Sequence, residues 1–177
     1  MKTNYKRAIK AINKLGDKRF FIQYINEGRM VLLSEGHMII SVPASDFEEY
    51  KSELKGSIKE IDLLDNFNKA IKNEDEAVDL RMTTVKITCN YETKDCRVFK
   101  GDGILTVVNE AFLDIIRDTF YVDYIATGLK THGSKAPLFY ADKIYDTETS
   151  SWRVVGGFMI LPICMNVRDV LNTVLDN

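Results

Sequence analysis

The chain has 177 residues, of which 45% are hydrophobic and 28% are charged, and it contains only three prolines. This composition is typical of a globular protein and excludes the disordered, collagen-like and disulfide-scaffold classes. The length predicts one ordinary domain, or two small subdomains that share a core. We see neither the apolar block of a signal peptide nor an apolar segment long enough to span a bilayer, so we expect a cytoplasmic protein with no membrane partner.

The formal net charge of −2 conceals a separation of charge along the chain. Residues 1–34 contain eight Lys and Arg against two Asp and Glu, a net charge of +6, whereas residues 35–80 contain five against twelve, a net charge of −7. Residues 81–177 contain eleven against twelve. Such segregation indicates either that oppositely charged segments pack together and neutralise each other, or that separate charged surfaces attract different partners. We favour the first explanation.

The first part of the chain predicts one helix followed by three strands. Apolar side chains recur at three- and four-residue spacing over residues 4–15, which predicts an amphipathic helix closed by Gly16. Three segments rich in β-branched and aromatic residues follow, separated by tight turns, which predicts a meander ended by Pro43. These expected strands are residues 19–25, 30–33 and 38–42.

Short helices and an acidic connector are expected next. Ser45 and Asp46 are suited to cap a short helix, and Ser57 is suited to start another that carries Ile58 and later apolar residues. The acidic run at 74–76 is the best candidate for a connector.

The second part repeats the order of one helix and then three strands. Asn109 is expected to cap a helix that runs to Asp118. We therefore predict an α+β fold with an internal repeat, in which both long helices pack on one side of antiparallel strands. The two expected subdomains are residues 1–76 and 77–177. Strands are predicted at 78–84, 85–89, 96–100, 104–108, 120–126, 138–140 and 154–163, and a terminal helix is expected from about residue 166.

One pair of segments links the two halves and points to a family. MIISVP at 38–43 and GFMILP at 157–162 are both apolar strands that end at proline. A helix followed by an antiparallel meander, present twice, resembles the subdomains of DNA sliding clamps, the processivity factors of replicative polymerases. Residues 104–163 look most like one such subdomain, because FMILPI at 158–163 is similar to the strand that closes the bacterial clamp chain. Residues 1–43 resemble another.

The resemblance implies a DNA-binding face on the first helix. Clamps line their central hole with helices carrying Lys and Arg, which attract phosphates without reading bases. Lys2, Lys6, Lys10 and Lys14 are four residues apart and therefore lie on one side of that helix. The implied partners are DNA and replication or regulatory proteins, and a clamp-like role further implies a homo-oligomer.

The second long helix departs from the family pattern. Glu110, Asp114 and Asp118 fall on one stripe, with Arg117 nearby, and an acidic stripe that faced DNA would repel it. Residues 44–76 also have no counterpart in the family pattern that we can place.

Few residues are suited to catalysis or to metal binding. The only histidines are His37 and His132, and no phosphate-binding glycine motif occurs. Cys89, Cys96 and Cys164 include no CxxC pair, which indicates reduced thiols. We therefore assign no catalytic residue, metal or cofactor.

Two alternatives to a non-enzymatic, clamp-like protein stay open. One is an α+β interaction or regulatory module that uses the acidic face against a basic partner. The other is a small hydrolase that uses the loop of His132, Ser134 and Lys135, although no nucleophile elbow or oxyanion feature surrounds Ser134. Trp152, next to Arg153, is expected to be either a partially exposed interaction anchor or a core or strand-edge residue.

Overall fold

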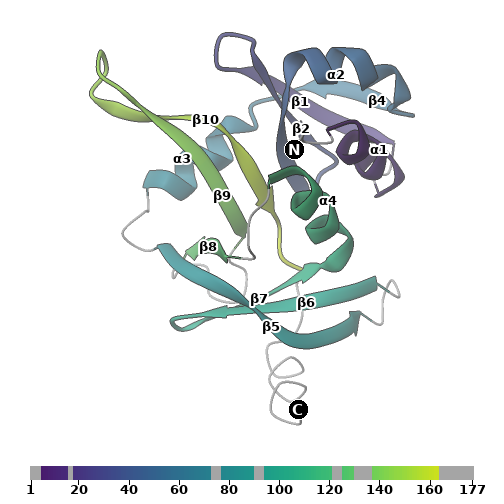
Figure 1. The fold of residues 1–177 in the computed structure, drawn as a ribbon, viewed down its shortest axis with the longest axis vertical. Helices are drawn as coiled ribbons and strands as arrows, with labels where there is room; N and C mark the ends of the chain where they lie inside the picture. Colours follow the sequence, from purple (N-terminus) through teal and green to yellow (C-terminus); the bar gives the residue numbers. More distant parts are fainter. Residues whose placement is uncertain are drawn as a thin grey trace.

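The part of the chain that the structure describes is an α+β fold built on one ten-stranded sheet (Figure 1). The computed structural model describes residues 5–15, 18–72, 77–89, 94–120, 125–129 and 137–163. The strand order is β4-β1-β2-β3-β10-β9-β8-β5-β6-β7, and all neighbouring strands are antiparallel except β1 and β4. The strands are β1 (Arg19–Ile25), β2 (Met30–Ser34), β3 (Met38–Pro43), β4 (Ser57–Glu60), β5 (Ala77–Cys89), β6 (Lys94–Gly101), β7 (Ile104–Asn109), β8 (Ile125–Leu129), β9 (Leu138–Asp146) and β10 (Ser151–Ile160).

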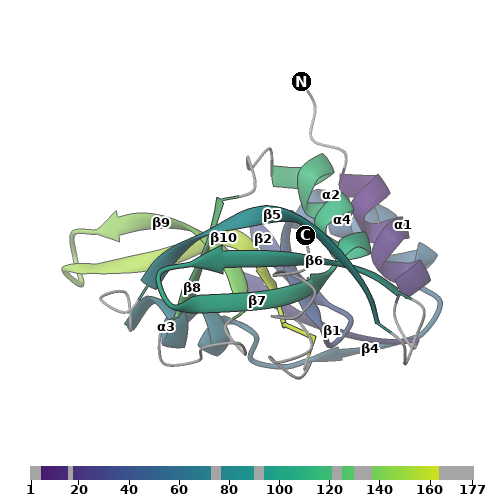
Figure 2. The same cartoon turned by 90° about the horizontal axis from the view of Figure 1, so that it is seen from below.

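The helices cover both faces of this sheet. Figure 2 shows α1, α2 and α4 above the strands and α3 below them. The two long helices α1 and α4 therefore share one face, as the sequence predicts. No helix in the described ranges is both long and apolar enough to cross a bilayer. The helices are α1 (Tyr5–Leu15), α2 (Ala44–Tyr50), α3 (Leu64–Lys72) and α4 (Glu110–Phe120), with a short 3-10 helix η1 (Lys51–Glu53) after α2.

The described residues form three apolar clusters, and the two largest lie on opposite faces of the sheet. On the face of α1 and α4, Ile9 and Ile12 join Phe112, Ile116 and Phe158, and all five are buried. This cluster contains residues from both halves of the chain, so the halves share a core. The cluster beneath α3 contains Leu32, Leu63, Phe67, Phe139, Val154 and Met159.

The two halves meet at the centre of the sheet through β3 and β10. Phe158 lies opposite Ile40, and Ile160 lies opposite Met38. These strands are the two proline-ended segments that the sequence singles out. The order of the nearest strands is symmetric about them, with β2 and β1 on one side and β9 and β8 on the other. Beyond these, β4 alone follows β1, whereas β5, β6 and β7 follow β8. Each meander follows its own helix, α1 or α4.

The prediction that a helix begins at Ser57 is wrong for the first residues of that segment. Residues 57–60 form β4, which pairs parallel with β1, and the amide of Ser57 donates a hydrogen bond of 3.0 Å to the carbonyl oxygen of Lys18. The helix α3 begins only at Leu64. Spacing of Ile58 and Ile61 suits a helix, but the backbone of β1 supplies a strand partner that lies far away in the sequence.

Other boundaries differ from the prediction in smaller ways. One strand, β5, replaces the two expected at 78–89, with a shift of register between Met82 and Lys86. Phe120 ends α4 instead of starting a strand, and β10 begins at Ser151 and ends at Ile160. The acidic connector at 74–76 and the expected terminal helix lie outside the described residues.

Candidate functional site

The lysine stripe predicted on α1 is divided between different surroundings. The ammonium group of Lys6 lies 4.8 Å from the centre of the Tyr50 ring, and Nζ of Lys10 lies 3.1 Å from Oε2 of Glu53. Tyr50 and Glu53 both follow β3, in the acidic segment of residues 35–80. The ion pair between Lys10 and Glu53 therefore neutralises charge between this segment and the basic residues 1–34. Lys2 lies outside the described residues.

A groove between α1 and α4 carries the outward cations of α1. Its cavity volume is about 230 Å³, and it is bordered by Arg7 and Lys14 from α1 and by Asp114 from α4. Arg7 and Lys14 are seven residues apart, about two helical turns, so they project in nearly the same direction. The rest of the lining is mainly apolar: Ala8, Ala11, Leu15, Ala111 and Ile115.

Arg7 is a candidate binding residue that the sequence analysis missed, because that analysis considered only the lysines spaced four residues apart. The signal that identifies it is the buried face of the helix, since Ala8, Ile9 and Ile12 are buried. Arg7 and Lys14 lie on the side away from that face. The position of a cation relative to the core is therefore a better guide than its distance in sequence from other cations.

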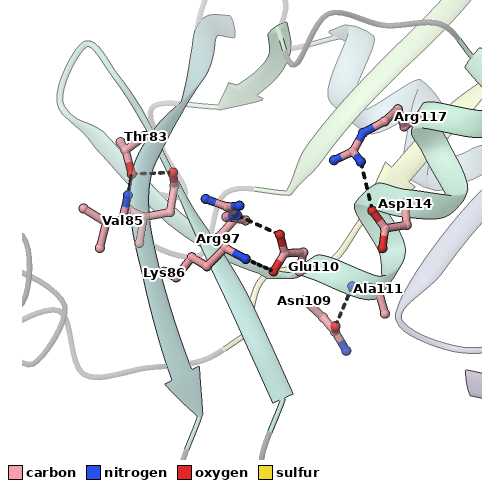
Figure 3. A network of polar contacts seen from close by, with 10 residues as sticks. Thr83, Val85, Lys86, Arg97, Asn109, Glu110, Ala111, Asp114 and Arg117 are labelled. Carbon is pink, nitrogen blue, oxygen red and sulfur yellow. Dashed lines mark hydrogen bonds and ion pairs between the residues drawn. The ribbon is translucent and has the colours of Figure 1, made fainter.

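Glu110 anchors the first turn of α4 to the sheet (Figure 3). Its Oε1 accepts a hydrogen bond of 2.9 Å from Nε of Arg97, and its Oε2 lies 3.2 Å from Nζ of Lys86. Burial acts to raise the pKa of Glu110, but the hydrogen bonds from Arg97 and Lys86 outweigh it and hold the pKa below its ordinary value. The first carboxylate of the acidic stripe is therefore neutralised by β5 and β6.

The second carboxylate of the stripe also has a cation beside it. Oδ1 of Asp114 lies 3.3 Å from Nη1 of Arg117, one turn along α4 (Figure 3). Asn109 caps the helix as predicted, because its Oδ1 accepts a hydrogen bond of 2.9 Å from the amide of Ala111. The side chain of Asp118 lies outside the described part of the structure.

A second concave surface opens on the face of α3, beside the turn between β2 and β3. Its cavity volume is about 240 Å³. The amide of His37 donates a hydrogen bond of 3.0 Å to Oε1 of Glu35, whose side chain is 2% exposed. The carbonyl oxygen of His37 accepts a hydrogen bond of 2.8 Å from the amide of Leu161, a half-exposed rim residue. The lining is mostly apolar and includes Phe21, Met38, Ile39, Ile61, Leu63 and Met159.

The residues considered for catalysis do not form a described site. The loop with His132, Ser134 and Lys135 lies outside the described residues. Cys96 is buried and lies opposite Ile87 in the pairing of β5 with β6, not opposite Cys89. Within the ranges that the structure describes, no group of three or more His, Cys, Asp or Glu side chains is arranged to hold a metal ion.

Comparison with protein-family models, with curated proteins and with solved structures found no match.

Proposed function

We propose that this protein is a non-enzymatic, DNA sliding clamp-like protein that binds the phosphate backbone through the outward face of α1. One observation carries the proposal: α1 and α4, which each begin a helix-and-meander unit, lie side by side on one face of a continuous sheet. Clamps, which the sequence resembles, line their central hole with helices that carry Lys and Arg. The symmetric order of the strands nearest to β3 and β10 supports a duplicated unit.

The charges around the groove are compatible with phosphate binding. Two cations, Arg7 and Lys14, and one carboxylate, Asp114, border it, and Asp114 has Arg117 beside it. The carboxylate of Glu110 is directed to Arg97 and Lys86 in the sheet. The acidic stripe of α4 therefore repels DNA less than its sequence predicts. Contacts of this kind are independent of base sequence, because only phosphate oxygens are neutralised.

The number of outward cations sets the strength of binding by one chain. If Arg7 and Lys14 each neutralise one phosphate, the logarithm of the binding constant falls with the logarithm of salt concentration with a slope of about −2. Two contacts per chain give weak binding, so a clamp-like role needs several copies. Two helix-and-meander units are also too few to encircle a duplex.

Fluorescence anisotropy with a labelled DNA duplex, repeated over a series of salt concentrations, tests the proposal. Lys14→Glu is expected to weaken binding and to flatten the salt dependence. Lys10→Glu is the matched control, because it makes the same charge change on the same helix at a residue that pairs with Glu53. Equal losses for both variants, or no salt-dependent binding by the unmodified protein, would contradict the assignment.

The recess beside His37 favours a protein-interaction module as the second candidate. It is lined mostly by apolar side chains and has Leu161, 46% exposed, on its rim. An apolar side chain of a partner protein fits such a surface. The acidic face proposed from sequence has less support, because Glu53 pairs with Lys10, and Asp65 pairs with Lys69. Absence of DNA binding would favour this candidate.

A further inference from the structure

Several exposed cations lie together where α1 ends and where β1 and β4 begin. Within the described part of the chain, none of them pairs with a carboxylate, whereas other exposed cations, such as Lys51 and Lys69, do. Figures 1 and 2 both place α1 and β4 at the same end of the molecule. We call this surface the basic corner, and its residues are Lys14, Lys18, Arg19, Lys55 and Lys59.

Backbone contacts hold the segments of the basic corner against each other. The amide of Lys55 donates a hydrogen bond of 2.7 Å to Oδ1 of Asn13, near the end of α1. The amide of Ser57 donates one of 3.0 Å to the carbonyl oxygen of Lys18, just before β1. A Cβ atom on Gly56, between these two amides, would lie 2.1 Å from the same carbonyl oxygen. The close approach of the two segments therefore depends on glycine at this position.

The basic corner spans the edge of the sheet. Arg19 lies opposite Ser57, and Phe21 lies opposite Lys59. Because alternate residues of a strand point to the same face, Arg19, Phe21 and Lys59 share one face. This is the face of α3, since Phe21 packs against the apolar cluster beneath that helix. Lys14 borders the groove between α1 and α4, so the cations extend from that groove around the edge strand β4.

Positive charge at the basic corner is only partly balanced by its own segments. Residues 14–19 and 55–60 contain five cations against two carboxylates, Asp17 and Glu60, a net charge of +3. Asp17 lies outside the described residues, and Glu60 points to the face of β4 opposite that of Lys59. The C-terminal end of α1 adds a partial negative charge of only about half an elementary charge. A bound anion would therefore relieve repulsion among these cations.

We propose that the basic corner binds the phosphate backbone of duplex DNA and continues the path that begins at Arg7 and Lys14. This inference rests on the proposed function and extends its DNA-binding surface from α1 to the edge of the sheet. Cations that neutralise phosphates release counterions, so each contact adds to the salt dependence of binding. If the other four cations of the basic corner also neutralise one phosphate each, the slope steepens from about −2 to about −5.

The make-up of the basic corner favours a polyanion over a protein or a membrane. Protein interfaces are dominated by aromatic or other anchors that fill pockets, and membrane-surface binding buries apolar side chains. Of the basic corner, only Lys14 lines either cavity described above. The most exposed aromatic side chains, Trp152 and Tyr145, are 56% and 52% exposed but lie on β10 and β9. The exposed apolar side chains beside the basic corner are Leu15 and Ile58, 37% and 39% exposed, so charge distinguishes this surface more than apolar area does.

Fluorescence anisotropy of a labelled duplex over a series of salt concentrations tests the basic corner without a change in α1. The double variant Lys55→Glu, Lys59→Glu is expected to weaken binding at least about tenfold and to flatten the salt slope by about two. Arg29→Glu, Lys69→Glu is the matched control, because it makes the same change in net charge at exposed cations that already pair with carboxylates. Equal losses for both double variants, or no loss for the first, would overturn the proposal.

The basic corner and the outward face of α1 can fail separately as DNA-binding surfaces. Weaker binding by Lys14→Glu, with none by Lys55→Glu, Lys59→Glu, would overturn the basic corner and leave the assignment of α1 intact. The reverse result would support the basic corner and contradict the assignment of α1. Competition by poly-L-glutamate as effective as that by unlabelled duplex would overturn phosphate binding in favour of an acidic protein. Tighter binding to phosphatidylserine vesicles than to the duplex would overturn it in favour of a membrane.

Acetylation of lysine side chains, followed by mass spectrometry, locates the bound surface without relying on a substitution. Lys18, Lys55 and Lys59 are expected to react several-fold more slowly when the duplex is present, whereas Lys69 on α3 is not. Unchanged reaction at the three lysines of the basic corner, under conditions where the duplex is bound, would contradict the proposal even if the double variant fails to fold.

Discussion

The amide of Gly157 donates a hydrogen bond of 2.8 Å to Oγ of Ser41, at the point where the β9–β10 hairpin leaves the sheet. Ser41 is 2% exposed, so neither group has access to water in place of this bond. The φ angle of Gly157 is 136°, and a Cβ atom there would lie 2.2 Å from the carbonyl oxygen of Tyr140. A hydroxyl from the first half of the chain and a bend in the second half therefore hold the central strands together.

Gly157→Ala is expected to lower the free energy of unfolding by about 3 kcal/mol, since it adds a steric clash to an unfavourable backbone conformation. Chemical denaturation measures the change. Gly28→Ala is the control: Gly28 has a φ of 79°, but a Cβ atom added there would have no neighbour within 4 Å. It is expected to cost about 1 kcal/mol, from backbone strain alone. Equal costs for both would refute the steric explanation.

Ser41→Ala is expected to lower the free energy of unfolding by about 1 to 2 kcal/mol, because it leaves the buried amide of Gly157 without its partner. Thermal or urea unfolding would detect this loss. Ser45→Ala, at an exposed position on α2, is expected to change stability by less than about 0.5 kcal/mol. A Ser41 variant as stable as the Ser45 variant would show that the hydrogen bond is not important.

The ion pair between Lys10 and Glu53 is expected to contribute less than about 1 kcal/mol, since both side chains are partly exposed to solvent, which screens the pair. Lys10→Glu places two carboxylates together and should destabilise the protein slightly. Adding Glu53→Lys restores the pair with its charges exchanged and should recover most of the loss. A double-mutant cycle measures this coupling, and failure of the exchange to recover stability would show that the pair is not the cause.

Glu110 is expected to make stability depend on pH. Its folded pKa lies below the ordinary value of 4.5, so its contribution is present above that value and is lost as pH falls through the folded pKa. Glu110→Gln should therefore cost about 1.5 kcal/mol at pH 7 and progressively less in acid. Unfolding measured from pH 7 to pH 3 gives the comparison, with the exposed Asp114→Asn as control. A cost that does not change with pH would exclude the charge as its source.

Local pattern was sufficient for elements whose partners are near in sequence. The helix α1 and the strands β1 to β3 follow from apolar spacing and from turn residues, and their observed bounds agree closely with the prediction. The cap at Asn109 was also predicted, because a capping side chain binds an amide only two residues away. The single apolar face of each helix predicted that α1 and α4 pack on a sheet, and the internal repeat predicted that they share one side of it.

Tertiary structure alone decided the features that depend on distant partners. Residues 57–60 became a strand because β1 offers a free edge, which the spacing of Ile58 and Ile61 does not reveal. Similarly, helical periodicity groups Lys6, Lys10 and Lys14, but only the packing of η1 against α1 turns Lys10 toward Glu53. Sequence determines which side chains share a face of an element. Which neighbour that face meets depends on long-range packing, and this sets the charge presented to solvent.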